Sequence, residues 1–283
     1  MNKVVTYFFD EYRKQRNARL FKNLLYVFLV VKCLLWLFNF DILFGEYAVS
    51  LTYKEPIGFF KSFAYIIYLS KSSNLALWFI CTTLLLSLVS LFGKRSYVLA
   101  DLIIYLLVLN LDIRIYTTTT AGESLLVNLC FLSAWLRKDF NKGIGTYDQI
   151  KVLLHNTAFI ALILQVCVLY GFSALAKWYD ADWISGEAVY LTTKAEHYSR
   201  PFMVNIADPI HFLTVAVTYI LLLYQSLFPL LVWIKKIKPY FLLIGVLMHL
   251  YIAFVLGLFF FGLIMVITYV LFFDFKTHAD VKA

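Results

Sequence analysis

Residues 240–272 read YFLLIGVLMHLYIAFVLGLFFFGLIMVITYVLF, an unbroken apolar run of 33 residues. As a single helix this run would be about 50 Å long, whereas the hydrocarbon core of a bilayer is about 30 Å thick. Two arrangements are open: one long tilted helix, or two spans joined by a tight turn near Gly257. We favour two spans, because the run then returns the chain to the side of its basic segments.

Composition places the whole chain in the same class. Of its 283 residues, 62% are hydrophobic and only 15% are charged, and the mean hydropathy is +0.80, whereas soluble domains are about half apolar and a quarter charged. Six further runs are long and apolar enough to span: 21–40, 74–92, 97–113, 123–136, 152–176 and 210–234. We predict an all-α transmembrane bundle of eight spans, one membrane domain over 1–283 with a basic N-terminal segment 1–20 and a short tail 274–283.

The positive charges predict the orientation. Fifteen Lys and Arg lie in the segments 1–22, 94–95, 137–151 and 235–238, against six in the alternate loops. Basic loops stay in the cytoplasm, so we predict a cytoplasmic N-terminus and a multi-pass protein of the bacterial inner membrane. The net charge of +8 forms no stripe, so it indicates contact with the lipid bilayer and not with nucleic acid.

Several other patterns limit the function. The four cysteines (Cys33, Cys81, Cys130 and Cys167) lie in apolar segments without a C-x-x-C pattern, so we interpret them as small core residues and predict no metal site. The chain contains no P-loop and no GxGxxG, which argues against an ATP-driven pump and a dinucleotide enzyme. Residues 57–71, IGFFKSFAYIIYLSK, are amphipathic and predicted to lie in the membrane interface.

Ionisable residues gather at the predicted outer ends of four spans. They are Asp112, Arg114, Glu123, Lys177, Asp180, Asp182, Asp208 and His211. Ionisable groups at membrane depth are costly and often functional, so we predict a cavity open to the outside. The alternative is that these charges face water and lipid headgroups. Lys177 itself has three possible roles: a salt-bridge partner, a base or proton carrier, or a snorkelling anchor.

Three polar residues lie inside predicted spans. Lys32, in VFLVVKCLLWLF, has two interpretations: it snorkels toward the outer end of its span, or it is buried in a pair with Asp101 or Glu123. His249 lies about ten residues beyond the inner basic loop and is expected to be neutral and bonded to a neighbouring helix. Gln225 precedes a proline and is interpreted as a hydrogen-bonding residue at a kink.

Residues 176–191, AKWYDADWISGEAVYL, carry a family resemblance. They resemble the horizontally transferred transmembrane domain, shared by vitamin K-dependent gamma-carboxylases and bacterial maturation proteins of the sporulation-delaying-toxin system. The family pattern of a Lys followed by W-x-x-G is matched by Lys177, Trp183 and Gly186, and DADW is similar to the carboxylase motif. The segments FPLLVW at 228–233 and 242–273 are similar to the closing part of the family pattern, with His249 as the matching histidine.

The chain departs from the carboxylase pattern at three places. Trp178 stands where the carboxylases have the second lysine, which is assigned as their base, and Gln225 stands where family members often have Glu. The stretch LDIRIYTTTTAGES at 111–124 lacks the polar histidine of the carboxylases. Some proton-transfer or peptide-maturation chemistry is therefore expected more than full carboxylation.

Two functions follow from the resemblance. In the first, the protein is a membrane enzyme acting from the outer face on a peptide or lipid-soluble substrate. Lys177 is then the proton acceptor, Asp180 or Asp182 adjusts its protonation, and His249 or Arg114 stabilises negative charge. The expected substrate-binding residues are Trp183, Gly186, Arg114, Glu123, His211 and Gln225. The cofactor is left open, as a quinone-like molecule or none.

In the second function, the protein is a non-catalytic accessory that helps a small secreted peptide to mature or cross the membrane, together with a co-encoded membrane partner. The outer cavity would then be a binding groove. An ion-coupled transporter is a third interpretation, but the sequence lacks the inverted halves that are typical of such proteins.

Overall fold

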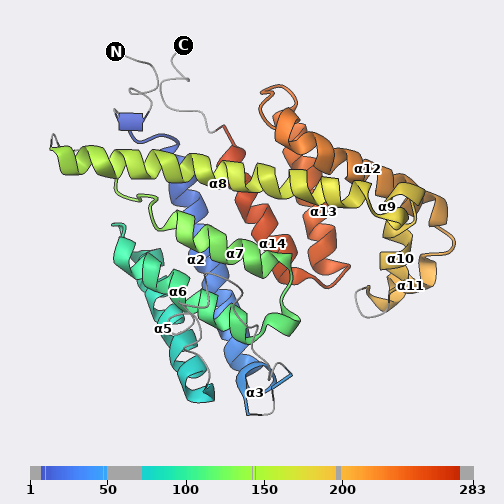
Figure 1. Cartoon of the computed structure of the whole chain (residues 1–283), viewed down its shortest axis with the longest axis horizontal. Helices are drawn as coiled ribbons and strands as arrows, with labels where there is room; N and C mark the ends of the chain where they lie inside the picture. Colours follow the sequence, from blue (N-terminus) through green and yellow to red (C-terminus); the bar gives the residue numbers. More distant parts are fainter. Residues whose placement is uncertain are drawn as a thin grey trace. The chain divides into compact units, whose positions relative to one another are not determined.

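The computed structural model describes residues 8–9, 11–46, 48–49, 72–141, 143, 145–195 and 199–274, and all regular structure in these ranges is helical (Figure 1). The all-α prediction is therefore confirmed for the described residues. The chain divides into two compact units, 1–162 and 163–283, which we call unit 1 and unit 2 and describe separately. The predicted interfacial segment 57–71 lies outside the described residues, as does the tail after Asp274.

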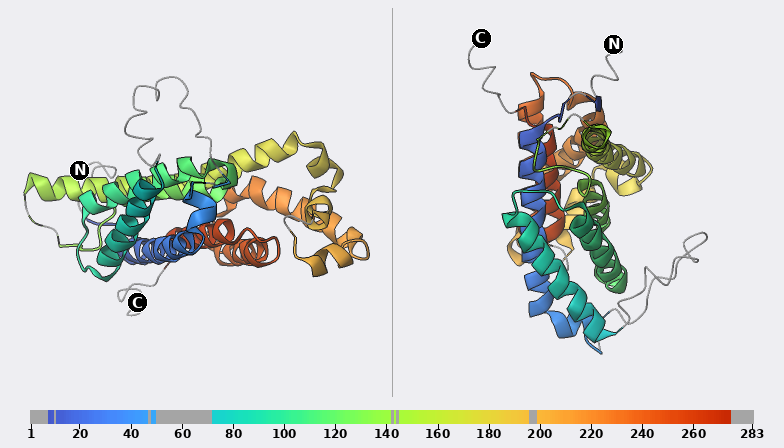
Figure 2. Two further views of the ribbon diagram at one scale, coloured as in Figure 1. Left: turned by 90° about the horizontal axis from the view of Figure 1, so that it is seen from below. Right: turned by 90° about the vertical axis from the view of Figure 1, so that its left-hand side faces the viewer.

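Unit 1 contains the N-terminal helices. They are α2 (Gln15–Phe38), α3 (Phe40–Phe44), α5 (Ser73–Phe92), α6 (Val98–Arg114), the short η3 (Tyr116–Thr118), α7 (Ala121–Ser133) and the first half of α8 (Thr146–Trp178). Helix α5 packs against both α2 and α6, and α6 packs against α7 (Figure 2). Local side chains define where two of them start: Ser72 Oγ accepts from the Leu75 N–H at 3.1 Å, and Thr120 and Glu123 form a capping box.

Helix α5 shows how these helices meet. Its buried positions are Ala76, Ile80, Thr83, Ser87 and Ser90, and its exposed ones include Leu77, Trp78, Leu85, Val89 and Phe92. Small and hydroxyl-bearing residues therefore face the neighbouring helices while large apolar residues face outward. This is the reverse of a soluble protein and is typical of helices packed within lipid.

The N-terminal segment is fastened to the start of α8 inside unit 1. Asn156 accepts from the Arg13 N–H at 2.8 Å and donates to the carbonyls of Glu11 at 2.9 Å and Phe8 at 3.2 Å. Nε2 of His155 lies 2.9 Å from the Arg13 carbonyl. Both α8 side chains are buried, so the segment supplies hydrogen-bonding partners to polar groups on an apolar helix.

Unit 2 contains the rest of α8 and the C-terminal helices. They are α9 (Ala181–Ser185), α10 (Ala188–Lys194), α11 (Pro201–Ile206), α12 (His211–Leu231), α13 (Lys238–Phe254), α14 (Phe259–Tyr269) and η4 (Val270–Phe272). The run 240–272 is thus two helices, as we favoured. They pack against each other around a turn in which Gly257 has φ 70°, a left-handed conformation that suits glycine. Lys238 and Asp274 form an ion pair at 2.6 Å between the other two ends.

Within the described residues, four helices are long and apolar enough to cross a membrane: α2, α5, α8 and α12. Helices α6 and α13 have 17 residues each, α7 has 13 and α14 has 11. At 1.5 Å per residue, these four are between about 16 and 26 Å long, shorter than a hydrocarbon core of about 30 Å. The described part of the chain therefore contains four apolar helices long enough to cross a bilayer, together with the four shorter helices α6, α7, α13 and α14.

Candidate functional site

Lys177 lies at the end of α8, on the helix face that also carries Tyr170 and Ser173. Residues three, four and seven positions apart share one face of a helix. The Lys177 ammonium donates a hydrogen bond to Ser173 Oγ at 2.9 Å, and the Ser173 hydroxyl donates to Gln225 Oε1 on α12 at 3.1 Å. A short polar chain thus connects the end of α8 to Gln225, which the sequence predicted as a hydrogen-bonding residue.

Trp183 covers the Lys177 amine from α9. The amine nitrogen lies 4.6 Å from the centroid of the Trp183 ring, a cation–π contact. We call Lys177, Ser173, Gln225 and Trp183 the Lys177 centre. Three of its four members were predicted as site residues. Ser173 was missed, although its spacing of four residues from Lys177 was a usable signal.

The DADW stretch positions Trp183 through helix capping. Asp180 Oδ1 accepts from the N–H groups of Asp182 at 2.9 Å and Trp183 at 3.4 Å, so Asp180 is the N-cap of α9. Gly186 ends α9 with φ 87°. A Cβ at this position would lie 2.9 Å from Val215 Cγ1 of α12, so the motif glycine permits a close approach to α12.

The two carboxylates do not neutralise Lys177. Asp180 and Asp182 are both exposed, and among the described residues neither forms an ion pair with the Lys177 amine. The salt-bridge interpretation of Lys177 therefore does not describe this structure. The neighbours of the amine are a hydroxyl group and an indole ring, both uncharged.

Other predicted site residues lie in unit 1. Lys32 and Glu123 form a buried ion pair at 2.8 Å, which confirms one of the two predicted pairings. The other oxygen of Glu123 accepts from the N–H and the hydroxyl of Thr120, so this carboxylate also starts α7. Arg114 is buried and donates to the Phe44 carbonyl at 2.8 Å. Asp112 lies half-buried on α6.

A further buried pair in unit 1 was missed by the sequence analysis. Lys22 Nζ lies 2.8 Å from Asp101 Oδ2 and donates to the Leu136 carbonyl at 2.7 Å, while Tyr26 donates to Asp101 Oδ1 at 2.5 Å. The side chains of Lys22 and Asp101 are 0% and 3% exposed. The sequence analysis counted Lys22 among the topology signals, but it is a core residue.

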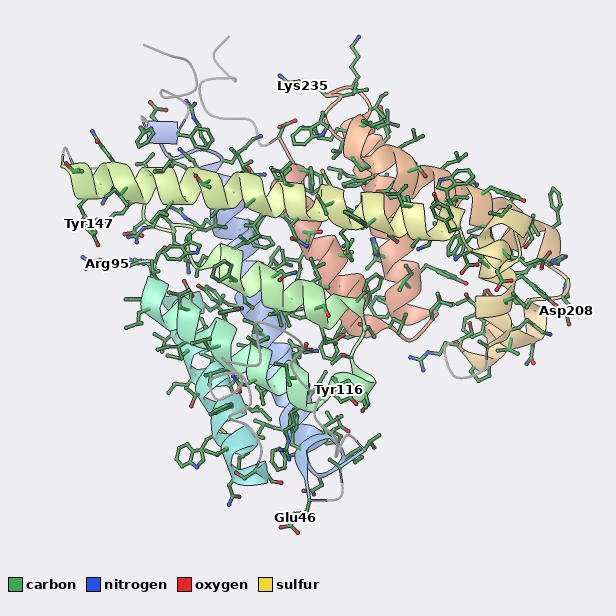
Figure 3. The ribbon with its side chains drawn as sticks, in the orientation of Figure 1. Glu46, Arg95, Tyr116, Tyr147, Asp208 and Lys235 are labelled. Atoms are coloured by element: carbon green, nitrogen blue, oxygen red, sulfur yellow. The ribbon has the colours of Figure 1, made fainter. Side chains whose placement is uncertain are left out.

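The predicted residues Asp208 and His211 form a separate exposed cluster in unit 2. Asp208, in the turn between α11 and α12 (Figure 3), accepts from the Tyr190 hydroxyl at 2.7 Å and pairs with Lys194 at 3.0 Å. His211 Nε2 lies 2.9 Å from Glu187 Oε2. These contacts connect α10 with the start of α12.

The cluster leads to a prediction about pH. The hydrogen bonds from Tyr190 and Lys194 lower the pKa of Asp208, and the Asp208 carboxylate raises the pKa of both partners. For the carboxylate, the depressed folded-state pKa means that the stabilisation is present above its usual pKa and is lost as pH falls through the folded value. For Lys194, the raised folded-state pKa means that the stabilisation is present below its usual pKa and is lost as pH rises through the folded value.

We expect Asp208→Asn to lower the pH at which Tyr190 titrates, because a neutral amide no longer favours the protonated phenol. NMR of ¹³Cζ-labelled tyrosine measures this titration. Asp182→Asn removes another exposed carboxylate of unit 2 and should leave the Tyr190 curve unchanged. An identical curve in both variants and the unaltered protein would contradict the assignment.

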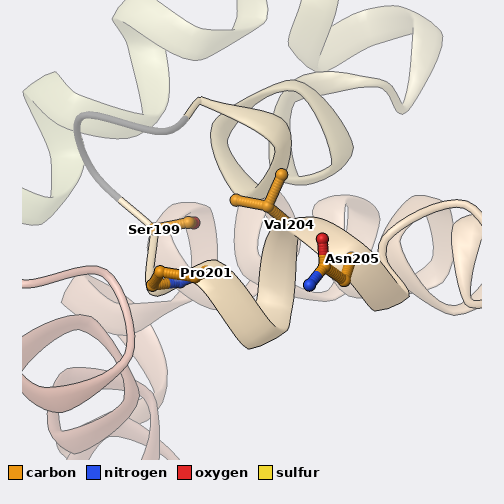
Figure 4. A pocket seen from close by; sticks show the side chains of 4 residues that line it. All are labelled: Ser199, Pro201, Val204 and Asn205. Atoms are coloured by element: carbon orange, nitrogen blue, oxygen red, sulfur yellow. The ribbon is translucent and has the colours of Figure 1, made fainter.

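The remaining features do not add to the Lys177 centre. His249 is buried and bonded to Tyr170 of α8 at 2.7 Å, as predicted for a neutral histidine between helices. Cys33, Cys130 and Cys167 are buried, as predicted, whereas Cys81 is exposed. A cavity of about 350 Å³ is lined by Ser199, Pro201, Val204 and Asn205 (Figure 4), none of them a predicted site residue.

Compared with known protein families, curated proteins and solved structures, the chain shows no match.

Proposed function

We propose that the protein is an eight-span protein of the bacterial inner membrane with a cytoplasmic N-terminus, related to the horizontally transferred transmembrane domain. In this proposal, Lys177 acts at the outer face as the proton acceptor on a peptide or lipid-soluble substrate. The fold supplies the helices, and the Lys177 centre supplies the chemistry.

Contacts within each unit support the eight-span topology. They join helix ends that this topology puts on the same side of the membrane. On the inner side they are Lys138 to the Ser90 carbonyl and Lys238 to Asp274; on the outer side they are Arg114 to the Phe44 carbonyl and the Arg200 N–H to the Val255 carbonyl. The shorter helices can be accommodated by local thinning of the bilayer.

Within the described residues no carboxylate forms an ion pair with the Lys177 amine, which donates to Ser173 and lies over the Trp183 ring, and this is the observation that favours a proton acceptor. A paired carboxylate would hold the proton on the amine, whereas a hydroxyl group and a ring face hold it less firmly. Lys177 is only half-buried, so the proton that it must lose before it accepts one from a substrate can pass to solvent water. The hydrogen bonds from Lys177 to Ser173 and from Ser173 to Gln225 hold the amine on the face of α8 that lies toward Gln225 of α12.

A second candidate function is the non-catalytic accessory. Its support is the apolar surface beside the Lys177 centre, where Trp178, Tyr179 and Ile184 are exposed, Tyr179 to 89%. Exposed aromatic and aliphatic side chains at a membrane edge suit the binding of an apolar peptide segment. The lysine would then bind a carboxylate of the peptide and transfer no proton.

The test is to co-express the protein with the genes that flank its own and to record the mass of any short secreted peptide that they encode. We expect a changed mass, and we expect Lys177→Ala to lower the yield of changed peptide at least about 100-fold, the usual contribution of a general base. A peptide that copurifies unchanged supports the accessory function.

Lys151→Ala is the matched control, because it removes a lysine from the opposite end of the same helix. Membrane insertion of both variants is checked by their amounts in the membrane fraction. Equal peptide modification by the Lys177→Ala variant and the unaltered protein would exclude Lys177 as the base.

A further inference from the structure

Three tyrosines and one histidine form a buried polar network in unit 2. Nε2 of His249 on α13 lies 2.7 Å from the hydroxyl of Tyr170 on α8, which is bonded to the hydroxyl of Tyr269 on α14. The Tyr269 hydroxyl lies 3.1 Å from that of Tyr224 on α12. All four side chains are at most 4% exposed. Four helices thus contribute one polar ring each.

The donor and acceptor of each hydrogen bond in the network can be assigned, because the network ends at a carbonyl. The Tyr224 hydroxyl donates to the Phe241 carbonyl at 3.2 Å, and a carbonyl can only accept. Tyr224 has one hydroxyl proton, so its oxygen accepts from Tyr269. By the same reasoning Tyr269 accepts from Tyr170, whose oxygen then accepts from His249. The proton of the neutral imidazole is therefore on Nε2.

This direction determines what the other ring nitrogen can do. Nδ1 of His249 then carries a lone pair and is a hydrogen-bond acceptor. It is buried, and no group in the described part of the chain bonds to it. Buried acceptors are normally paired, since desolvation without a partner is costly. The one N–H of the neutral ring is used by Tyr170, which leaves Nδ1 as an acceptor.

We propose that Nδ1 of His249 binds the hydroxyl group of a neutral, apolar molecule that enters unit 2 from the bilayer, such as a long-chain alcohol or phenol. A donor is required because Nδ1 accepts. The molecule is neutral and apolar because the ring contacts of His249 are with Tyr170, Tyr269 and Phe261, none of them charged. This site is separate from the Lys177 centre and does not depend on its chemistry.

The test is NMR of the full-length protein in lipid nanodiscs with ¹⁵N-labelled histidine. The His249 signals are assigned by their loss in His249→Gln. We expect a neutral ring with the proton on Nε2. We also expect a shift of the Nδ1 signal that saturates with added 4-octylphenol and is absent with 4-octylanisole, which has nearly the same apolar body but no donor.

Variants separate the network from general packing. Tyr170→Phe removes the acceptor of the Nε2 proton, so both tautomers should appear. The compound 4-octylphenol binds only the tautomer with a lone pair on Nδ1, so at equal populations it should bind about twofold more weakly. Tyr105→Phe, in unit 1, should change neither result. A proton on Nδ1 in the unaltered protein, equal shifts with both compounds, or no shift with either would each overturn the proposal.

Discussion

Lys22→Ala is expected to lower the free energy of unfolding by about 3 to 5 kcal/mol, the usual cost of removing one partner from a buried ion pair. Asp101 would keep its charge inside unit 1 without the ion pair at 2.8 Å, with the Tyr26 hydroxyl still donating to it and Lys138 acting on it at longer range. The Leu136 carbonyl would lose its hydrogen bond from the lysine as well. Unfolding in mixed micelles, followed by tryptophan fluorescence, measures the loss.

Two further variants make this prediction specific. Lys94→Ala removes an exposed lysine beside α5 and should change the free energy of unfolding by less than about 0.5 kcal/mol. Combining Lys22→Met with Asp101→Asn should recover more than half of the loss, because the buried site is then neutral and Asn still accepts from Tyr26. A Lys22→Ala protein as stable as the Lys94→Ala protein would show that the pair is not buried.

Gly245→Ala is expected to destabilise unit 2 by about 1 to 3 kcal/mol, the usual cost of overpacking a core. Gly245 lies on α13 against the tyrosine network. A Cβ at this position would overlap the hydroxyl oxygens of Tyr224 and Tyr269. The two rings would have to move apart, which also breaks the hydrogen bond between them. Unfolding in mixed micelles measures the stability.

Gly171→Ala is the matched control, since it makes the same change inside α8. The nearest side-chain atom to a Cβ there is Pro229 Cγ at 3.8 Å, an ordinary contact. This variant should be neutral or up to about 1 kcal/mol more stable, because Ala favours the helix over Gly. Equal losses from both glycine substitutions would mean that Gly245 has room for a methyl group.

Hydropathy predicted the long helices well, because each is a continuous apolar run. The length of the run 240–272 left one helix or two open, and the side on which the basic segments lie favoured the break near Gly257. Hydropathy did not predict the short helices α9, α10 and α11, which have five to seven residues. One or two turns are too few to show a helical period. Helix α9 depends on the Asp180 cap, α11 begins at Pro201, and α9 and α10 pack against α12.

The site was predicted in part for similar reasons. The pairing of Lys32 with Glu123 followed from the cost of a charge inside an apolar run. Lys22 has the same local pattern as a lysine at a membrane edge, so its burial depends on Asp101 arriving from α6. Asp180 follows Lys177 by three residues, a spacing that pairs side chains only within a continuous helix. Because α8 ends at Trp178, Asp180 caps α9 instead.

The attachment of residues 8–13 to α8 has a consequence for how this segment tolerates change. The hydrogen bonds described above, from residues 8–9 and 11–13 to Asn156 and His155, come from main-chain atoms of Phe8, Glu11 and Arg13. Replacing these three side chains leaves the donors and acceptors in place. Inserting or deleting one residue displaces all of them together. These hydrogen bonds therefore depend on the spacing of the peptide groups, while the ring of Tyr12, which packs edge-on against His155, is the side chain of the segment that we expect to tolerate replacement least.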